Sequence, residues 1–215
     1  MPLSKITRND PEVHSRLTEL GLSKPDLVRI VQEAVSAKNE SVPIDPLNAP
    51  GTLAYIHGIR AKRQVLLPQG WEIDRTDNIE ATYNPITNIK LVYQNADTAA
   101  DPIQEPKAIS GKGTAADRMV DQGQQTFLFP DMQKEEEELH AKVNSSIWFL
   151  CVATKDDDVM AELSCPKSID CKQFNGFHER IFIVKSGDWN NPNGLGSHDD
   201  DSFDVQDFEI SISRK

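Results

Sequence analysis

The chain has 215 residues, 38% of them hydrophobic and 27% charged, which is the composition of an ordinary globular protein with one large or two small domains. Its longest apolar run, residues 145–153, is far too short to span a bilayer, and the first ten residues contain no apolar signal region. Its three cysteines cannot all pair within one chain. We therefore expect a cytoplasmic protein in a reducing compartment, with no contact with a membrane.

The formal net charge is -11, and the negative charge is concentrated in the second half of the chain. Residues 1–66 carry nine basic and seven acidic groups, whereas residues 131–215 carry nine basic and eighteen acidic groups. Such a surface disfavours nucleic acid as a partner, because binding to the phosphate backbone requires cations. It suits a basic protein partner, or the imitation of a phosphate backbone by carboxylates.

Three helices are expected in the first third of the chain. An asparagine–aspartate cap opens the first, over residues 9–20. The second covers residues 23–38, where Ser23 and an acidic residue three positions later form a short capping box ahead of one apolar face. A linker with three prolines follows at residues 41–51, and the third helix is expected over residues 51–67.

Strands are expected after the helices. Residues 78–83 and 88–93 alternate with a period of two around an Asn–Pro turn, which predicts a β-hairpin. Residues 95–113 are rich in proline and glycine and predict a long loop. Further strands are expected at residues 146–153, 159–165, 179–185 and 205–213.

The fold class that follows is α+β, with N-terminal helices and a β-hairpin before a mostly antiparallel C-terminal sheet. The division that we expect is a helical region with the hairpin at residues 1–95, a linker with short helices at residues 96–143, and an antiparallel β region at residues 144–215. One integrated domain is the alternative division. The strand expected at residues 205–213 is either internal or paired across a homodimer.

The stretch KAISGKGTAADRM, residues 107–119, comes closest to a nucleotide-binding motif. A P-loop requires a glycine where this chain has Pro106, a serine or threonine where it has Gly113, and a buried strand before the loop. The residues before it do not predict a strand. We therefore expect a loop in which Thr114 caps a short helix, and no nucleotide cofactor.

Two features leave DNA binding open as an alternative. Residues 15–31 have the glycine and the apolar spacing of a helix-turn-helix, but the second helix would present a nearly neutral surface, with Pro25 where a base contact is wanted. Arg60, Lys62 and Arg63 would supply the positive charge, although cations near a helix C-terminus also have a structural explanation.

Metal-binding patterns are incomplete. Cys165, Cys171 and His178 supply three ligands where a structural zinc site uses four, in tight pairs. The acidic runs lack the spacing of a calcium loop. A metal-dependent nuclease is the enzyme that stays open, and the nearest residues for it are Asp158, Glu162 and Lys167. We expect no metal and no cofactor, and we assign no catalytic residue.

Several stretches resemble uncharacterised proteins of phages, prophages and related bacterial mobile DNA. They are GTLAYIHGIRAKRQVLLPQGWEIDRTDNIEATYNP (residues 51–85), KAISGKGTAADRM (107–119), QQTFLF (124–129) and AELSCP (161–166), within a likeness that runs from about residue 15. The family has no assigned activity. The resemblance therefore implies a context, the bacterial cytosol and phage–host biology, in which small acidic proteins often bind and regulate or block host factors.

We therefore expect an acidic interaction protein, not an enzyme, that binds and modulates a host or phage protein, as an anti-defence inhibitor or a mimic of DNA. The alternatives are a DNA-binding regulatory protein that uses the N-terminal helices, and a metal-dependent nuclease. The acidic surface expected to bind the partner comprises Glu135, Glu136, Glu137, Glu138, Asp156, Asp157, Asp158, Asp199, Asp200 and Asp201. The basic alternative comprises Arg60, Lys62 and Arg63.

Overall fold

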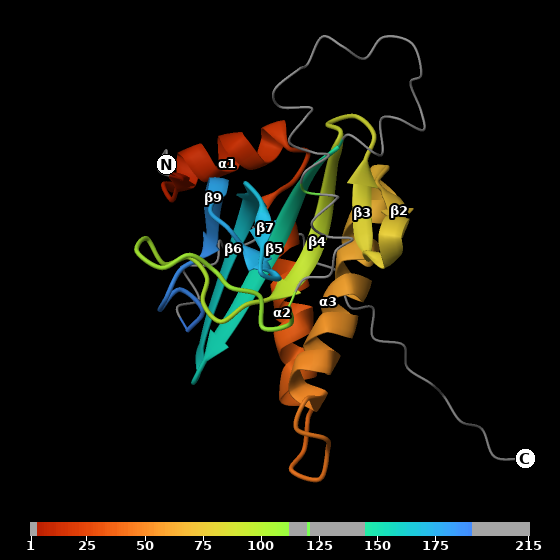
Figure 1. The fold of residues 1–215 in the computed structure, drawn as a ribbon, viewed down its shortest axis with the longest axis vertical. Coiled ribbons are helices and arrows are strands. Elements are labelled where there is room, and N and C mark those ends of the chain that lie inside the picture. Colours follow the sequence, from red (N-terminus) through yellow and green to blue (C-terminus); the bar gives the residue numbers. More distant parts are fainter. Residues whose placement is uncertain (1–3, 112–119, 121–144, 191–215) are drawn as a thin grey trace, which may run out of the picture.

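The computed structural model describes residues 4–111, 120 and 145–190, which build three helices and a seven-stranded sheet beside a small two-stranded one (Figure 1). The helices are α1 (Asp10–Glu19), α2 (Lys24–Asn39) and α3 (Ala49–Leu66). The strands are β1 (Lys5–Thr7), β2 (Glu72–Asp74), β3 (Ala81–Asn84), β4 (Ile89–Asn95), β5 (Ser146–Lys155), β6 (Asp158–Pro166), β7 (Ile169–Asp170), β8 (Gln173–Phe174) and β9 (Phe177–Val184).

The large sheet has the order β1-β9-β6-β5-β4-β3-β2 and combines both halves of the chain. Its pairs are antiparallel except for β1 with β9 and β4 with β5, which are parallel. A parallel pair needs a long crossover, and the chain between β4 and β5, residues 96–145, provides it. The predicted α+β class is confirmed, and the large sheet is mostly antiparallel with two parallel pairs.

Most predicted elements are confirmed close to their expected bounds. Ser23 caps α2, since its hydroxyl accepts a hydrogen bond from the Asp26 amide at 3.2 Å. Helix α3 begins two residues earlier than expected and carries Pro50 in its first turn, where the missing N–H is not needed. The β3–β4 hairpin and strands β5, β6 and β9 follow the predicted pattern, whereas the strand expected at residues 205–213 lies outside the described residues.

The three helices lie on one side of the large sheet (Figure 1). Helices α2 and α3 pack against each other and against the central strands. The side chain of Leu150 of β5 is fully buried beneath these helices. Helix α3 comes very close to β4 at Gly58, where an added Cβ would lie 2.6 Å from the ring of Tyr93. A glycine at this position is therefore a requirement of the packing.

On the other face of the large sheet, residues outside α1, α2 and α3 pack against the strands, among them Val120, which is helical. The apolar cluster on this face includes Val92, Phe149 and Cys151, and the ring of Phe174 from β8 meets Phe149 with 4.9 Å between centroids. The short β7–β8 hairpin thus serves as a cover for β5. Among the described helices, none is long and apolar enough to cross a membrane.

Candidate functional site

The described part of the predicted acidic surface lies at the turn between β5 and β6. Asp156 and Asp157 are exposed there, and Asp158 is partly exposed at the start of β6. Together with Asp101 from the loop after β4, they border an open hollow of about 580 Å³ that also contains Lys155. The other predicted members, Glu135–Glu138 and Asp199–Asp201, lie outside the described residues.

Two of these four carboxylates are engaged in holding loops. Asp158 accepts hydrogen bonds from the Ser186 hydroxyl at 2.6 Å and from the Gly187 amide at 3.1 Å, and the Ser186 bond is the main cause of a lowered pKa for Asp158. Asp101 accepts bonds from two backbone amides of its own loop, which lower its pKa as well. Both side chains are therefore ionised at neutral pH, and Asp156 and Asp157 are the members most open to a partner.

The structure does not bring the predicted basic residues into one exposed cluster. Arg60 is exposed, but the ammonium group of Lys62 is fully buried and donates hydrogen bonds to the carbonyl oxygens of Glu80 at 2.7 Å and Leu91 at 2.8 Å. Arg63 forms an ion pair with the Glu80 carboxylate. Burial lowers the pKa of Lys62 to about 7. Only Arg60 is left as an open cation on this part of α3.

The trio considered for a nuclease is also divided. Glu162 is fully buried and forms an ion pair with Arg180, with one oxygen 2.7 Å from the guanidinium. Its carboxylate also accepts hydrogen bonds from the Ala100 amide at 2.6 Å and the Ser164 hydroxyl at 2.5 Å. Lys167 follows the end of β6 and is not among the contacts of Glu162. Among the described residues, no group of three or more histidine, cysteine, aspartate or glutamate side chains is placed to hold a metal ion.

The cysteines lie in different surroundings. Cys165 is buried on the helix-covered face, and burial raises its pKa to about 12, so it is a thiol at neutral pH. Cys171 is exposed in the turn between β7 and β8, and His178 is exposed on β9. The spacing that suggested a zinc site thus does not place these three side chains in one common environment.

The glycine-rich stretch begins in a loop. The segment before it, residues 101–107, has no strand, as predicted, and Ala108 forms a single bridge with Ala96. The positions from 112 to 119, with Thr114, lie outside the described residues. In residues 15–31, the segment considered for a helix-turn-helix, Lys24 at the start of α2 forms an ion pair with Asp10 of α1 at 3.1 Å.

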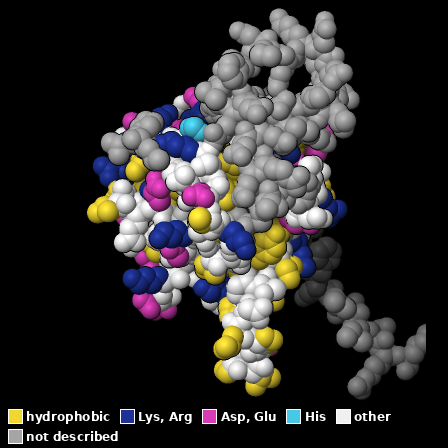
Figure 2. All heavy atoms as spheres, viewed as in Figure 1, with side chains coloured by type: hydrophobic (Ala, Val, Ile, Leu, Met, Phe, Trp, Pro, Cys, Tyr) yellow, Lys and Arg dark blue, Asp and Glu magenta, His cyan; other side chains and the backbone are white. Residues whose placement is uncertain are grey.

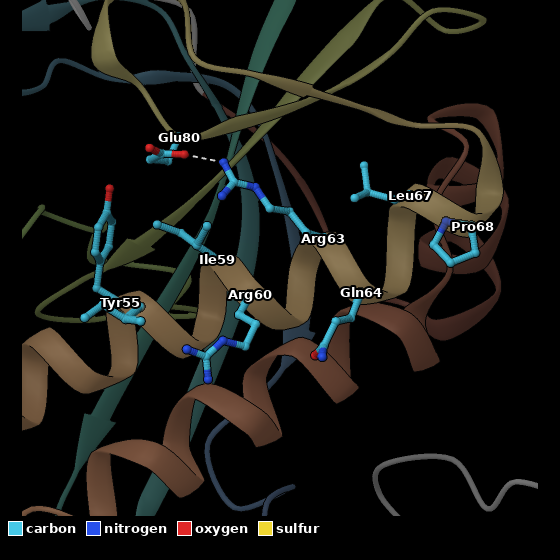
Figure 3. Close-up of a pocket in the computed structure, with 9 residues that line it drawn as sticks. Tyr55, Ile59, Arg60, Arg63, Gln64, Leu67, Pro68 and Glu80 are labelled. Atoms are coloured by element: carbon cyan, nitrogen blue, oxygen red, sulfur yellow. Dashed lines mark hydrogen bonds and ion pairs between the residues drawn. The ribbon is translucent and has the colours of Figure 1, made fainter.

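Sequence reasoning missed a groove along the outer side of α3 (Figure 3). It has a volume of about 660 Å³, and Ile59 forms its buried floor. The residues that line it are Tyr55, Ile56, Ile59, Arg60, Arg63, Gln64, Leu67, Pro68 and Glu80. Figure 3 shows Arg63 reaching up to Glu80, while Arg60 and Gln64 point to the other side of the helix. A sequence signal did exist, because Tyr55, Ile59 and Leu67 recur at helical spacing.

A second apolar surface is the loop between α2 and α3, residues 41–48, which projects from the body of the protein (Figure 1). Figure 2 shows hydrophobic side chains gathered at its tip. Ile44 is 93% exposed and Leu47 is fully exposed, with Val42 about half exposed beside them. From the sequence, this stretch was predicted only to be a linker. Large apolar residues between prolines are, however, unusual in a connection that merely has to be soluble.

The 41–48 loop is ordered by its own backbone and by one carboxylate. Asp45 accepts a hydrogen bond from the Val42 amide at 2.9 Å, and its own amide donates to the Val42 carbonyl at 2.9 Å. Pro43 and Pro46 restrict the backbone further. The apolar tip is therefore presented in a defined conformation.

No protein-family model, no curated protein and no solved structure matches this chain.

Proposed function

We propose that this chain is an interaction protein that binds and modulates another protein, and that the 41–48 loop inserts into that partner. The observation that carries the proposal is the exposure of Ile44 and Leu47 at the tip of a projecting, internally bonded loop. The resemblance to proteins of phages and mobile DNA points to a host or phage protein in the bacterial cytosol as the partner.

Burial of the side chains at the tip of this loop would contribute enough free energy to change the affinity for a partner. Burying a leucine or isoleucine side chain contributes about 1.5–3 kcal/mol, and each tenfold in affinity corresponds to about 1.4 kcal/mol. Because Asp45 and the two prolines already restrict the loop, little conformational entropy is lost when the loop binds. Two exposed apolar side chains on a preorganised loop can therefore contribute a substantial part of the affinity for a partner.

The acidic hollow supports the choice of a basic partner surface. Asp156 and Asp157 are exposed beside the ionised side chains of Asp101 and Asp158. A lysine or arginine of the partner would find an unbalanced negative charge there. The role of a DNA mimic belongs to this part of the proposal, since it requires a partner that normally binds a polyanion, and an anti-defence inhibitor can act on a partner of the same kind.

The test is a pull-down with the tagged full chain from nuclease-treated bacterial lysate, compared among three forms. The loop variant carries Ile44→Ser and Leu47→Ser. The control variant carries Ile86→Ser and Ile103→Ser, which are 91% and 90% exposed elsewhere on the surface. One stoichiometric protein should be captured by the natural chain and by the control but lost with the loop variant, and the purified pair should form a complex. Equal capture by all three forms would contradict a role for the loop.

A further inference from the structure

The groove along α3 differs in charge from the rest of the protein. The charged residues that line it are Arg60, Arg63 and Glu80, so it is locally positive in a chain of net charge -11. Arg63 is already paired with Glu80, and a third arginine, Arg75, approaches the same carboxylate at 3.3 Å. Among the described residues, Arg60 has no acidic partner.

Apolar and polar side chains follow the groove in two lines. Tyr55, Ile59 and Leu67 lie on the side of α3 that faces Glu80, while Arg60 and Gln64 project from the opposite edge (Figure 3). The apolar line extends from Tyr55 to Leu67, the residue directly after α3, and these twelve residue steps correspond to about 18 Å, or roughly three turns of a bound helix. A surface of this kind matches a ligand helix with one apolar face and carboxylates along its edge.

We infer that this groove binds an acidic amphipathic helix of a partner protein, with apolar side chains against Ile56, Ile59 and Leu67 and a carboxylate on Arg60. Bidentate pairing with a carboxylate is the interaction for which a free guanidinium is best suited. The net negative charge of the chain does not prevent this binding, because charges farther than about 8 Å are largely screened at physiological ionic strength. The local charge at Arg60 therefore decides which helix is accepted.

This surface is separate from the 41–48 loop, and the inference does not depend on the function proposed for that loop. The occupant is a partner helix rather than a second copy of this chain because the lining charges call for an acidic ligand. A second copy would bring its own Arg60 against the first across a symmetric contact.

The experiment uses two fluorescein-labelled peptides of about three helical turns. Both have leucines at helical spacing; the remaining positions are glutamate in one peptide and lysine in the other. Each is titrated with the full chain while fluorescence anisotropy is measured. The variants are Arg60→Glu and Ile56→Ser, with Arg29→Glu as a matched control, because Arg29 is an exposed arginine on α2 and its substitution changes the net charge equally. Circular dichroism confirms that each variant is folded.

The glutamate peptide should bind the natural chain more tightly than the lysine peptide. Arg60→Glu should weaken the glutamate peptide by about tenfold or more and strengthen the lysine peptide, as expected for a charge pair at a binding surface. Ile56→Ser should weaken both peptides, and Arg29→Glu should change neither. The loop is intact in every form, so these results are independent of the pull-down.

Three outcomes would overturn the inference. The first is that neither peptide binds at millimolar concentration. The second is that Arg29→Glu has the same effect as Arg60→Glu, which would show a response to net charge alone. The third is a dimer in sedimentation velocity that Ile56→Ser dissociates, because the groove would then be occupied by a second copy of the chain.

Discussion

The two faces of the large sheet are stabilised in different ways. On the face covered by helices, side chains such as Leu150 and Ile181 are buried among the apolar residues of α1, α2 and α3. On the opposite face, the strands bury ion pairs beside a smaller apolar cluster: Glu162 pairs with Arg180 at 2.7 Å, and Lys90 with Asp74 at 2.7 Å. Because successive residues of a strand point to opposite faces, one strand contributes to both kinds of packing.

The buried charges on the opposite face show how the loop after β4 is held against the sheet. Arg180 also donates hydrogen bonds to the backbone carbonyl oxygens of Asp101 at 2.9 Å and Gln104 at 3.0 Å, and Glu162 accepts one from the Ala100 amide. The buried pair therefore ties an irregular segment to the sheet, where a helix would use apolar contacts. Burial alone would raise the pKa of Asp74, but hydrogen bonds from Lys90 and Thr76 together hold it below its ordinary value.

The largest effect should come from breaking the Glu162–Arg180 pair. Arg180→Met removes the cation and leaves the Glu162 carboxylate buried without an opposite charge, so we expect the free energy of unfolding to fall by about 3–5 kcal/mol in urea titrations. Replacing both residues, with Glu162→Leu and Arg180→Met, should recover much of this loss because no charge stays buried. A loss below about 1 kcal/mol for the single variant would show that water reaches the pair.

A smaller effect is expected on the helix-covered face at Gly58. Gly58→Ala would place a methyl group 2.6 Å from the Tyr93 ring, and the resulting overpacking should lower the free energy of unfolding by about 1–3 kcal/mol. Gly51→Ala in the first turn of the same helix is the control, because its nearest neighbour atom is 3.9 Å away. That change should be neutral or stabilising by up to about 1 kcal/mol. Equal effects at the two glycines would mean that helix propensity, not the contact with Tyr93, governs both.

The sequence predicts the helix-covered face of the sheet better than the opposite face. Caps and periodicity predicted α1, α2 and α3 and the strands they cover, because burial of an apolar face imposes a pattern on the chain. Strands β1, β2, β7 and β8 have only two or three residues, too few for a pattern, and their positions depend on contacts far along the chain. Nothing local indicates that Glu162 meets Arg180 or that Ala100 donates to the pair.

At the candidate site, the exposure of Lys62 was misjudged because it was grouped with its chain neighbours Arg60 and Arg63. Its helical spacing from the other residues of α3 would have predicted its burial. Lys62 stands next to Arg63 in the chain, yet it follows Gly58 and Ile59 by four and three positions and precedes Leu66 by four. These are buried positions of α3, so the spacing places Lys62 on the inner face. The exposure of Ile44 and Leu47 had no such signal, since a proline-rich connection has no period from which burial can be judged.

The pH dependence of stability tests the contrast between the two faces at Lys62, which is a buried basic group on the helix-covered face without a carboxylate in contact. Its pKa is lowered from 10.5 to about 7, mainly by burial, so between these pH values the unfolded chain holds a proton that the folded chain has released. Stability should therefore rise with pH above 7 by up to about 1.4 kcal/mol per pH unit, and below pH 7 this group should contribute no slope.

Lys62→Met should remove that slope while retaining most of the packing of the side-chain stem. Urea titrations at several pH values above and below 7 would measure it for both forms, and the difference between the two curves isolates this one group from the other titrations of the chain. A difference that does not change with pH would mean that the Glu80 and Leu91 carbonyl oxygens stabilise the ammonium as well as water does. In that case the helix-covered face would tolerate a buried charge without the paired carboxylate that the opposite face supplies.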